Sequence, residues 1–239
     1  MKRKIITTSD GSKTIQIEDW NEQYHSIHGA IQEANHVFLK HGLLFYYHCH
    51  SVHTLREYSG SDLINILEIG FGTGLNAFLT LLEAEKLKQH INYVGVEAYP
   101  VSEEEIKQLN YVELISKTHK DEFENMHHVS WEANHHITPN FQLEKQEKFF
   151  KDIDAKSEFD IIYFDAFGAR VQPELWTEDI FEIMFEALKD NGILVTYSAK
   201  GSVRRAIQAI GFTVERLPGP PGKREMLRAA KPNVNASKI

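Results

Sequence analysis

The pattern of hydrophobic and polar positions changes character after residue 60. The segment Leu63–Ile69 is almost entirely apolar and rich in branched residues, which is typical of a strand buried on both faces of a parallel sheet. Similar apolar runs alternate with helical patterns through most of the remaining chain, which predicts an α/β fold. Further strands are expected at Ile91–Glu97, His127–Trp131 (weakly marked), Phe159–Phe164 and Gly192–Ser198, and helices at 75–87, 177–189 and 203–210, with a polar helical stretch before Phe159.

The first sixty residues lack this alternation. A strand pattern at Lys13–Glu18 follows the turn-forming pair Asp10-Gly11, which predicts a hairpin. A short helical pattern lies within residues 22–39, and the aromatic run Leu43–Tyr47 indicates another strand or a buried connector. We therefore expect residues 1–60 to form an extension that packs on a main domain at 61–230.

The end of the chain predicts an antiparallel pair of strands. Phe212–Leu217 and Glu225–Ala229 flank the turn sequence Pro218-Gly219-Pro220-Pro221-Gly222. The helix before the fifth strand is expected to stop at Asp190-Asn191-Gly192. Together these elements predict a mostly parallel sheet of seven strands that ends in an antiparallel hairpin, followed by a flexible tail at 231–239.

Composition is that of a soluble globular protein, with 42% hydrophobic and 25% charged residues. No apolar run approaches the ~20 residues of a membrane span, and no signal-peptide core follows the first residues. A single cysteine, Cys49, excludes an internal disulfide framework. These features predict a cytoplasmic protein with no membrane partner.

Charge is distributed unevenly along the chain. The formal net charge is −8, but nine basic and two acidic residues fall in Ser198–Ile239, so this region carries +7 and the rest −15. Such asymmetry is expected where one surface meets an anionic partner, although a solvated tail would give the same count. Two clusters stand out, Lys200-Gly201-Ser202-Val203-Arg204-Arg205 and Gly222-Lys223-Arg224-Glu225, and both suit phosphate contacts.

The strand Leu63–Ile69 runs directly into three alternate glycines, Gly70, Gly72 and Gly74, and then into a helix. Strand, glycine turn and helix let backbone N–H groups approach a nucleotide-like ligand closely. The dinucleotide fingerprint has the spacing G-x-G-x-x-G, whereas this chain has G-x-G-x-G preceded by Glu68. That pattern resembles motif I of the Rossmann-like class I methyltransferases that depend on S-adenosylmethionine (SAM).

Acidic residues follow the next two predicted strands. Glu97 lies about 20–25 residues past the glycine turn, where an acid binds ribose hydroxyls in nucleotide-binding sheets, although a surface acid at a strand end is the alternative. Glu132 follows the weak third strand, at the position that usually holds adenine in SAM sites. This part of the sequence predicts the adenosine half of a SAM site.

Asp165-Ala166-Phe167 ends the fourth predicted strand, on the edge of the sheet where ligands bind. Methyl transfer to nitrogen needs a neutral amine with its lone pair aimed at the methyl carbon. A carboxylate at this place orients the amine and takes its proton, and an aromatic face suits a planar base and a sulfonium charge. A helix cap or loop acid is the alternative for Asp165, and Phe164 is interpreted as core.

Thirteen histidines raise the question of a metal site. His48-Cys49-His50 with His53, and the pairs His127-His128 and His135-His136, match no zinc-ligand spacing. No metal is therefore expected.

Taken together, the motifs resemble one family: the methyltransferase half of the bacterial bifunctional tRNA-modifying MnmC enzymes and its single-domain relatives. The resemblance spans about Tyr24 to Leu227. Two positions differ from the family: Glu132 replaces an Asp, and the loop Ala166–Arg170 departs in detail. The resemblance rests on Glu68–Asn76, Phe164–Phe167, Pro173-Glu174-Leu175-Trp176, Val203-Arg204-Arg205, Gly222–Leu227, Tyr24-His25-Ser26, Gly29 and Val37-Phe38-Leu39.

The resemblance implies a reaction and a set of residue roles. The family transfers the methyl group of SAM to the primary amine of 5-aminomethyl(-2-thio)uridine at the tRNA wobble position, in the anticodon loop. No second dinucleotide fingerprint follows Leu227, so the FAD-dependent oxidase step of the bifunctional relatives is assigned to another protein. The implied residues are Glu68, Gly70, Gly72, Gly74, Asn76, Glu97 and Glu132 for SAM, Asp165 and Phe167 for catalysis, and Tyr24, Trp176, Lys200, Arg204, Arg205, Lys223 and Arg224 for tRNA.

Two other functions fit parts of the sequence. A SAM-dependent N-methyltransferase or an aminopropyltransferase-like enzyme on a small amine needs no basic surface, so the charge of the C-terminal region counts against it. A non-catalytic SAM- or tRNA-binding scaffold does not need Asp165. An NAD-dependent oxidoreductase is disfavoured by the glycine spacing.

Overall fold

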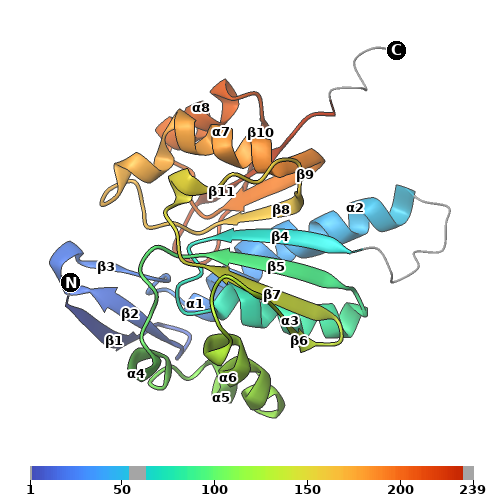
Figure 1. The fold of residues 1–239 in the computed structure, drawn as a ribbon. Helices are drawn as coiled ribbons and strands as arrows, with labels where there is room; N and C mark the ends of the chain where they lie inside the picture. The colour runs from blue at the N-terminus through green and yellow to red at the C-terminus, as the bar shows by residue number, and fades with distance from the viewer. Residues whose placement is uncertain (1, 54–62, 234–239) are drawn as a thin grey trace.

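The computed structural model describes residues 2–53 and 63–233, and its centre is one large sheet (Figure 1). The strands are β4 (Ile64–Ile69), β5 (Ile91–Val96), β6 (Asn134–Thr138), β7 (Phe141–Gln146), β8 (Phe159–Phe164), β9 (Leu188–Thr196), β10 (Thr213–Pro218) and β11 (Glu225–Ala230). Their spatial order is β10-β11-β9-β8-β4-β5-β7-β6, and the five strands from β9 to β7 are parallel. The α/β class, the mostly parallel sheet and the terminal antiparallel hairpin are thus confirmed.

The sheet has eight strands where seven were expected, and the third parallel strand is displaced along the sequence. His127 and His128 end helix α6 (Lys120–His128), and the stretch predicted as helical forms the antiparallel pair β6 and β7. In β7 the buried positions are Phe141, Leu143 and Lys145, alternating with half-exposed polar residues. A lysine at a buried position hides the strand pattern: its ammonium donates to the His127 carbonyl at 2.8 Å.

Helices cover the sheet on both faces (Figure 1). They are α3 (Leu75–Leu87), α4 (Glu103–Ile106), α5 (Tyr111–Ile115), α6, α7 (Glu178–Ala187) and α8 (Gly201–Ala209), with short 3₁₀ turns η3 (Lys117–His119), η4 (Phe150–Asp152) and η5 (Pro173–Trp176). One core cluster packs α3 and α6 against residues such as Tyr93 and Tyr163, and the other packs α7 and α8 against Leu67 and Ile162. The helix α7 ends before the predicted stop at 190–192, because β9 already begins at Leu188.

The N-terminal extension contributes a small sheet and a long helix. β1 (Arg3–Thr7), β2 (Lys13–Ile17) and β3 (Glu22–Gln23) form an antiparallel sheet, with the expected hairpin at Asp10-Gly11 and the turn η1 (Glu18–Trp20). α1 (Ala30–Ala34), the π-helical η2 (Asn35–Leu44) and α2 (Phe45–His53) follow one another directly. The run Leu43–Tyr47 is therefore helical and not a strand; an aromatic buried segment fits either.

This helix packs closely on the main sheet. A Cβ atom at Gly42 would lie 2.9 Å from the Tyr163 ring and 3.1 Å from Val195, so glycine lets η2 approach β8 and β9. No helix among residues 2–53 and 63–233 is long and apolar enough to cross a membrane. The expected boundary at residues 60–61 lies outside the described residues.

The first residue of the predicted tail, Lys231, is packed against the protein. Lys231 is buried, and its ammonium donates to the carbonyls of Phe185 and Leu188 at 2.8 and 2.7 Å. It therefore closes the end of α7 against the last strand, while residues 234–239 lie outside the described part of the chain.

Candidate active site

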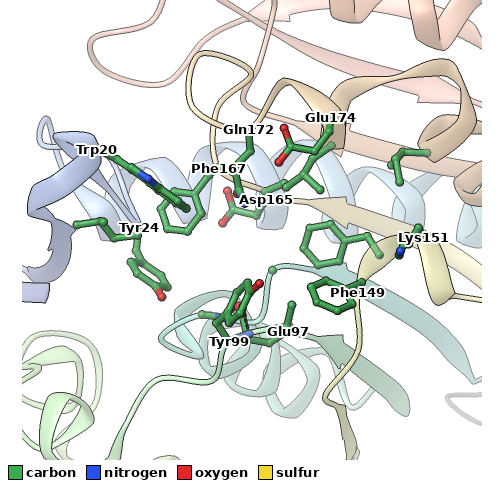
Figure 2. Close-up of a pocket in the computed structure, with 18 of the residues that line it drawn as sticks. Trp20, Tyr24, Glu97, Tyr99, Phe149, Lys151, Asp165, Phe167, Gln172 and Glu174 are labelled. Atoms are coloured by element: carbon green, nitrogen blue, oxygen red, sulfur yellow. Dashed lines mark hydrogen bonds between the residues drawn. The ribbon is translucent and has the colours of Figure 1, made fainter. Parts of the chain in front are cut away.

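A cavity of about 400 Å³ opens at the carboxyl edge of the parallel strands (Figure 2). Its lining comes from the ends of β4, β5 and β8, from the segment after β7, and from the N-terminal extension. This is the edge where open α/β sheets bind ligands. The lining residues are Arg3, Ile17, Trp20, Tyr24, His25, Gly70, Gly72, Glu97, Ala98, Tyr99, Phe149, Phe150, Lys151, Asp165, Ala166, Phe167, Gln172, Glu174, Leu175 and Ile180.

The glycine turn forms one wall through its backbone. Gly70, Gly72 and Gly74 have φ of +90°, +52° and +70°, a region that side chains rarely adopt. A Cβ atom at Gly70 would lie 2.9 Å from the Asp165 carbonyl oxygen, and one at Gly72 would lie 3.0 Å from the Tyr24 ring. Gly70 and Gly72 line the cavity, whereas Gly74 packs against His127 at the start of α3.

Glu97 stands at the end of β5 with its carboxylate held in place. One oxygen accepts from the Gly72 N–H at 3.1 Å and the other from the Tyr99 N–H at 3.0 Å. Burial raises the pKa of Glu97, and these two hydrogen bonds oppose that rise. The sequence placed this carboxylate beside the glycine turn, and the structure brings the two together.

Aromatic rings line the cavity beyond Glu97. Tyr99 and Phe149 meet edge to face with centroids 6.0 Å apart, and each is about half exposed. Lys151 lies over the Phe149 ring at 5.7 Å. This end offers flat apolar surfaces for a planar group such as adenine.

Glu132 does not belong to the lining. It precedes β7, its N–H donates to the Lys145 carbonyl, and its carboxylate accepts from the Glu147 N–H at 2.7 Å. The sequence assigned it to adenine because the third strand was placed too early. Phe149 and Phe150, which follow the true strand β7, line the cavity at this end instead.

Asp165 lies between the two ends of the cavity, directly after β8 (Figure 2). Its Oδ2 accepts from the Asn76 amide at 2.9 Å. Burial, with a contribution from the Glu33 carboxylate, raises the pKa of Asp165 to about 7, against the opposing effects of Asn76 and Lys223. A carboxyl group with this pKa exchanges protons near neutral pH, as a general base must.

Asn76 and Glu68 lie behind Asp165 and outside the lining. The Asn76 amide also donates to Glu68 Oε1 at 2.8 Å, and both residues are 1% exposed. Burial raises the pKa of Glu68 well above its ordinary value. The sequence assigned both to SAM, whereas the structure connects them to Asp165.

Three aromatic residues form the other end of the cavity. Phe167 meets Tyr24 edge to face at 4.9 Å and Trp20 at 5.7 Å (Figure 2). Arg3 lies over the Tyr24 ring at 5.7 Å, and its guanidinium donates to the Tyr99 carbonyl at 3.1 Å. Tyr24 and Phe167 were expected here; Trp20 was not, because nothing in its local sequence marks it.

Trp176 supports this end from outside the lining. It is 5% exposed, and its indole N–H donates to the Phe167 carbonyl at 2.8 Å. The role assigned from the sequence was direct contact with substrate. In the structure it holds the loop that carries Phe167.

The basic residues of the C-terminal region divide into two groups. Lys223 pairs with the buried Glu33 and lies 3.7 Å over the Tyr197 ring; Arg228 pairs with Glu215, and Arg216 with Glu225. Among the residues that the structure describes, Lys231 is buried against backbone carbonyls, and the other cations without an ion pair in this region are Lys200, Arg204, Arg205 and Arg224. The first three open α8 after β9 and the last lies in the β10–β11 turn, so all four are at the carboxyl edge.

Within the described ranges, no group of three His, Cys, Asp or Glu side chains is arranged to hold a metal ion. His25, which lines the cavity, binds Thr73 Oγ1 through Nε2 at 2.8 Å, and burial lowers its pKa to about 4. It is therefore neutral at pH 7.

The fold and this site are those of a SAM-dependent methyltransferase. Residues 108–232, more than half of the chain, match a family model described as S-adenosyl-L-methionine-dependent methyltransferase, and the chain belongs to that family. SAM is therefore its cofactor. The residues present fit it: close backbone approach at Gly70 and Gly72, a fixed carboxylate at Glu97 for ribose hydroxyls, and rings at Tyr99 and Phe149.

Curated relatives give the comparison more detail. The bifunctional protein MnmC of tRNA 5-methylaminomethyl-2-thiouridine biosynthesis from Cupriavidus metallidurans is 27% identical over 236 residues, covering 92% of this chain and 33% of the relative. The protein of the same name from Campylobacter fetus is 28% identical over 187 residues, 76% of this chain and 31% of the relative. The chain thus spans about a third of their length, and the resemblance that the motifs predicted is confirmed.

Two solved structures share the fold. MnmC2 from Aquifex aeolicus has a TM-score of 0.75 at 24% identity, covering 98% of this chain and 73% of that one. Spermidine synthase from Thermotoga maritima has a TM-score of 0.53 at 16% identity, covering 98% and 75%. At these identities the similarity is one of fold.

Proposed function

We propose that the protein transfers the methyl group of SAM to the primary amine of 5-aminomethyl(-2-thio)uridine at the tRNA wobble position, giving 5-methylaminomethyl(-2-thio)uridine. The observation that carries the proposal is Asp165, a carboxyl with a pKa near neutrality between the SAM wall and an aromatic end that suits a nucleobase. The names of the relatives support the same substrate class.

The residues divide the work as follows. SAM supplies an electrophilic methyl group on a sulfonium sulfur. Trp20, Tyr24 and Phe167 hold the uracil ring and point its aminomethyl group at Asp165, since aromatic faces stack on bases splayed out of a single-stranded loop. Asp165 takes one proton from the ammonium, which frees the lone pair for attack, and later releases it to solvent.

The pKa of Asp165 determines how turnover depends on pH. With its pKa near 7, Asp165 is protonated and inactive as a base in acid and ionised above neutrality. Turnover is therefore expected to rise as pH increases through about 7.

The four unpaired cations at the carboxyl edge would meet the anticodon stem–loop. Lys200, Arg204, Arg205 and Arg224 lie on α8 and the β10–β11 turn, at the same edge of the sheet as the cavity, where phosphate contacts would fix the position of the RNA without reading its sequence. We place the reaction in the cytoplasm, consistent with the single Cys49.

An enzyme acting on a small amine remains the second candidate. The likeness in fold to a spermidine synthase favours it, but a small amine needs neither the aromatic end nor the unpaired cations.

The test is a methylation assay with a matched inactive variant. Wild type and Asp165→Ala are incubated with methyl-labelled SAM and tRNA from a strain that lacks this methyl group, and the nucleosides are separated. We expect label in the modified wobble uridine with wild type and a rate lower by ~10²-fold or more with Asp165→Ala, the scale of a lost general base. Label in a small-amine pool and none in tRNA would overturn the proposal.

A further inference from the structure

One buried amide joins two carboxyl groups beneath the cavity. Asn76 Nδ2 donates one hydrogen to Asp165 Oδ2 at 2.9 Å and the other to Glu68 Oε1 at 2.8 Å. We propose that Asn76 is the positioning residue of the proton acceptor: it fixes Asp165 Oδ2 against the protein so that Oδ1 serves the substrate amine. This inference rests on the proposed function, because it takes Asp165 as the base.

The geometry separates this role from SAM binding. Asn76 is 1% exposed, it does not line the cavity, and both of its amide hydrogens are already donated. Its Oδ1 is buried without a partner among the described residues. The side chain does not line the cavity and both of its amide hydrogens are used, so its effect on the reaction passes through Asp165.

Asn76 lies in the first turn of α3. Asn76 follows Leu75, the first residue of the helix, and its carbonyl accepts from Thr80 Oγ1 at 2.7 Å. The glycine turn therefore forms one wall of the cavity and also determines the position of Asn76. One short segment, Gly70–Asn76, thus fixes the donor and the base relative to each other.

Glu68 accepts the second hydrogen of the Asn76 amide. A neutral Glu68 accepts the second amide hydrogen without adding a negative charge beside Asp165, and burial favours that neutral form. Other groups also act on Asp165: Glu33 disfavours its charged form, Lys223 favours it, and the buried Tyr197 hydroxyl lies within its field. Asn76 is the one described side chain that donates a hydrogen bond to Asp165.

The experiment replaces Asn76 and reads three quantities. For Asn76→Ala we expect kcat to fall about 10- to 100-fold, the effect of a misplaced catalytic group, with SAM affinity by calorimetry unchanged. In the SAM-free protein, the pKa of Asp165 measured by carboxyl ¹³C NMR should move upward, since a hydrogen bond to the ionised form is lost. The acidic limb of the kcat–pH profile should move the same way.

Thr80→Val is the matched control. It also removes a buried hydrogen bond of the same turn of α3, but its side chain does not reach Asp165. Its thermal stability is measured beside that of Asn76→Ala, and its kcat–pH profile should match that of the wild type. If Asn76→Ala does not fold, Asn76→Leu, which is similar in size and uncharged, removes the same donor and is read in the same three ways.

Each outcome decides the inference. If Asn76→Ala weakens SAM binding and leaves kcat unchanged, Asn76 belongs to the cofactor site and the inference is overturned. Equal losses for Asn76→Ala and Thr80→Val, with no movement of the Asp165 pKa, would reduce Asn76 to a structural role. Failure of the wild type to methylate tRNA refutes the proposed function, while the NMR measurement still tests the contact itself.

Discussion

The two ends of the cavity are built in different ways. At the donor end the wall beside Glu97 is backbone, from the turn Gly70–Gly74 and the ends of β4 and β5, and the Tyr99 and Phe149 rings lie beyond it. The acceptor end is made of side chains from distant segments, Trp20 and Tyr24 on the N-terminal extension and Phe167 after β8. Substitutions in the glycine turn of the donor end are poorly tolerated, because the backbone has no alternative rotamer. The side chains of the acceptor end can differ from one substrate to another.

The acceptor end depends on how the N-terminal sheet is attached. Arg170 pairs with Glu22 at 2.8 Å and donates to the carbonyls of Trp20 and Asn21, while Arg3 pairs with Glu105 of α4 at 3.2 Å. Arg170 is mostly exposed, and a surface pair of this kind contributes under about 1 kcal/mol. We therefore expect substitutions at this end to alter substrate binding more than SAM binding.

The largest effect is expected from Gly70→Ala at the donor end. A Cβ atom there would meet the Asp165 carbonyl at 2.9 Å, and φ is +90°, so strain of about 1–3 kcal/mol should lower SAM affinity by roughly 10- to 100-fold. Calorimetry with SAM measures the effect. Gly168→Ala is the control, because its Cβ would meet only the Tyr197 hydroxyl at 3.6 Å. Equal SAM affinity in the two variants would contradict the backbone description of this end.

A smaller and more selective effect is expected from Trp20→Ala at the acceptor end. Loss of one stacking ring costs about 1–3 kcal/mol per base, so kcat/KM for tRNA should fall by about tenfold or more while SAM affinity stays at the wild-type value. Steady-state kinetics with tRNA and calorimetry with SAM separate the two. Weaker SAM binding would show that the two ends are not independent.

The smallest effect is expected from Arg204→Ala combined with Arg205→Ala. If each arginine contacts one phosphate, the slope of log affinity against log salt should become shallower by about 1–2, with catalysis on bound tRNA unchanged. Filter binding over a salt series measures this slope. Arg216→Ala, which removes a cation already paired with Glu225 at 3.7 Å, should leave the slope nearly as in wild type. A shallower slope for Arg216→Ala, with no change for the double variant, would show that the β10–β11 hairpin contacts the RNA instead of α8.

Side-chain pairing explains why the charge count in the sequence overstated the basic surface. Lys223, counted as a phosphate ligand, is paired with Glu33 from α1, and Lys231 is buried against carbonyls. The groups that bind these two lysines are far from them in the sequence. A run of cations in the sequence therefore gives an upper limit for a binding surface, and tertiary contacts decide how much of it is free.

Nearly continuous apolar runs predicted β4, β5 and β8 closely, because strands buried on both faces have few polar positions. The same reasoning failed at β7, where Lys145 occupies a buried position, and so Glu132 was assigned the place that Phe149 and Phe150 fill. The helix at Leu43–Tyr47 was missed because a short aromatic run has no clear period.

The sequence by itself determined the α/β class, the glycine turn with its SAM-type spacing, and the identities of Glu97 and Asp165 at strand ends. These depend on local backbone preference and on the rule that parallel strands place their carboxyl ends together. Only the tertiary structure shows that Trp20 faces Phe167, that Lys223 is paired internally, and that Asn76 donates a hydrogen bond to Asp165. Those contacts join residues far apart in the chain, and no local pattern encodes which of them will meet.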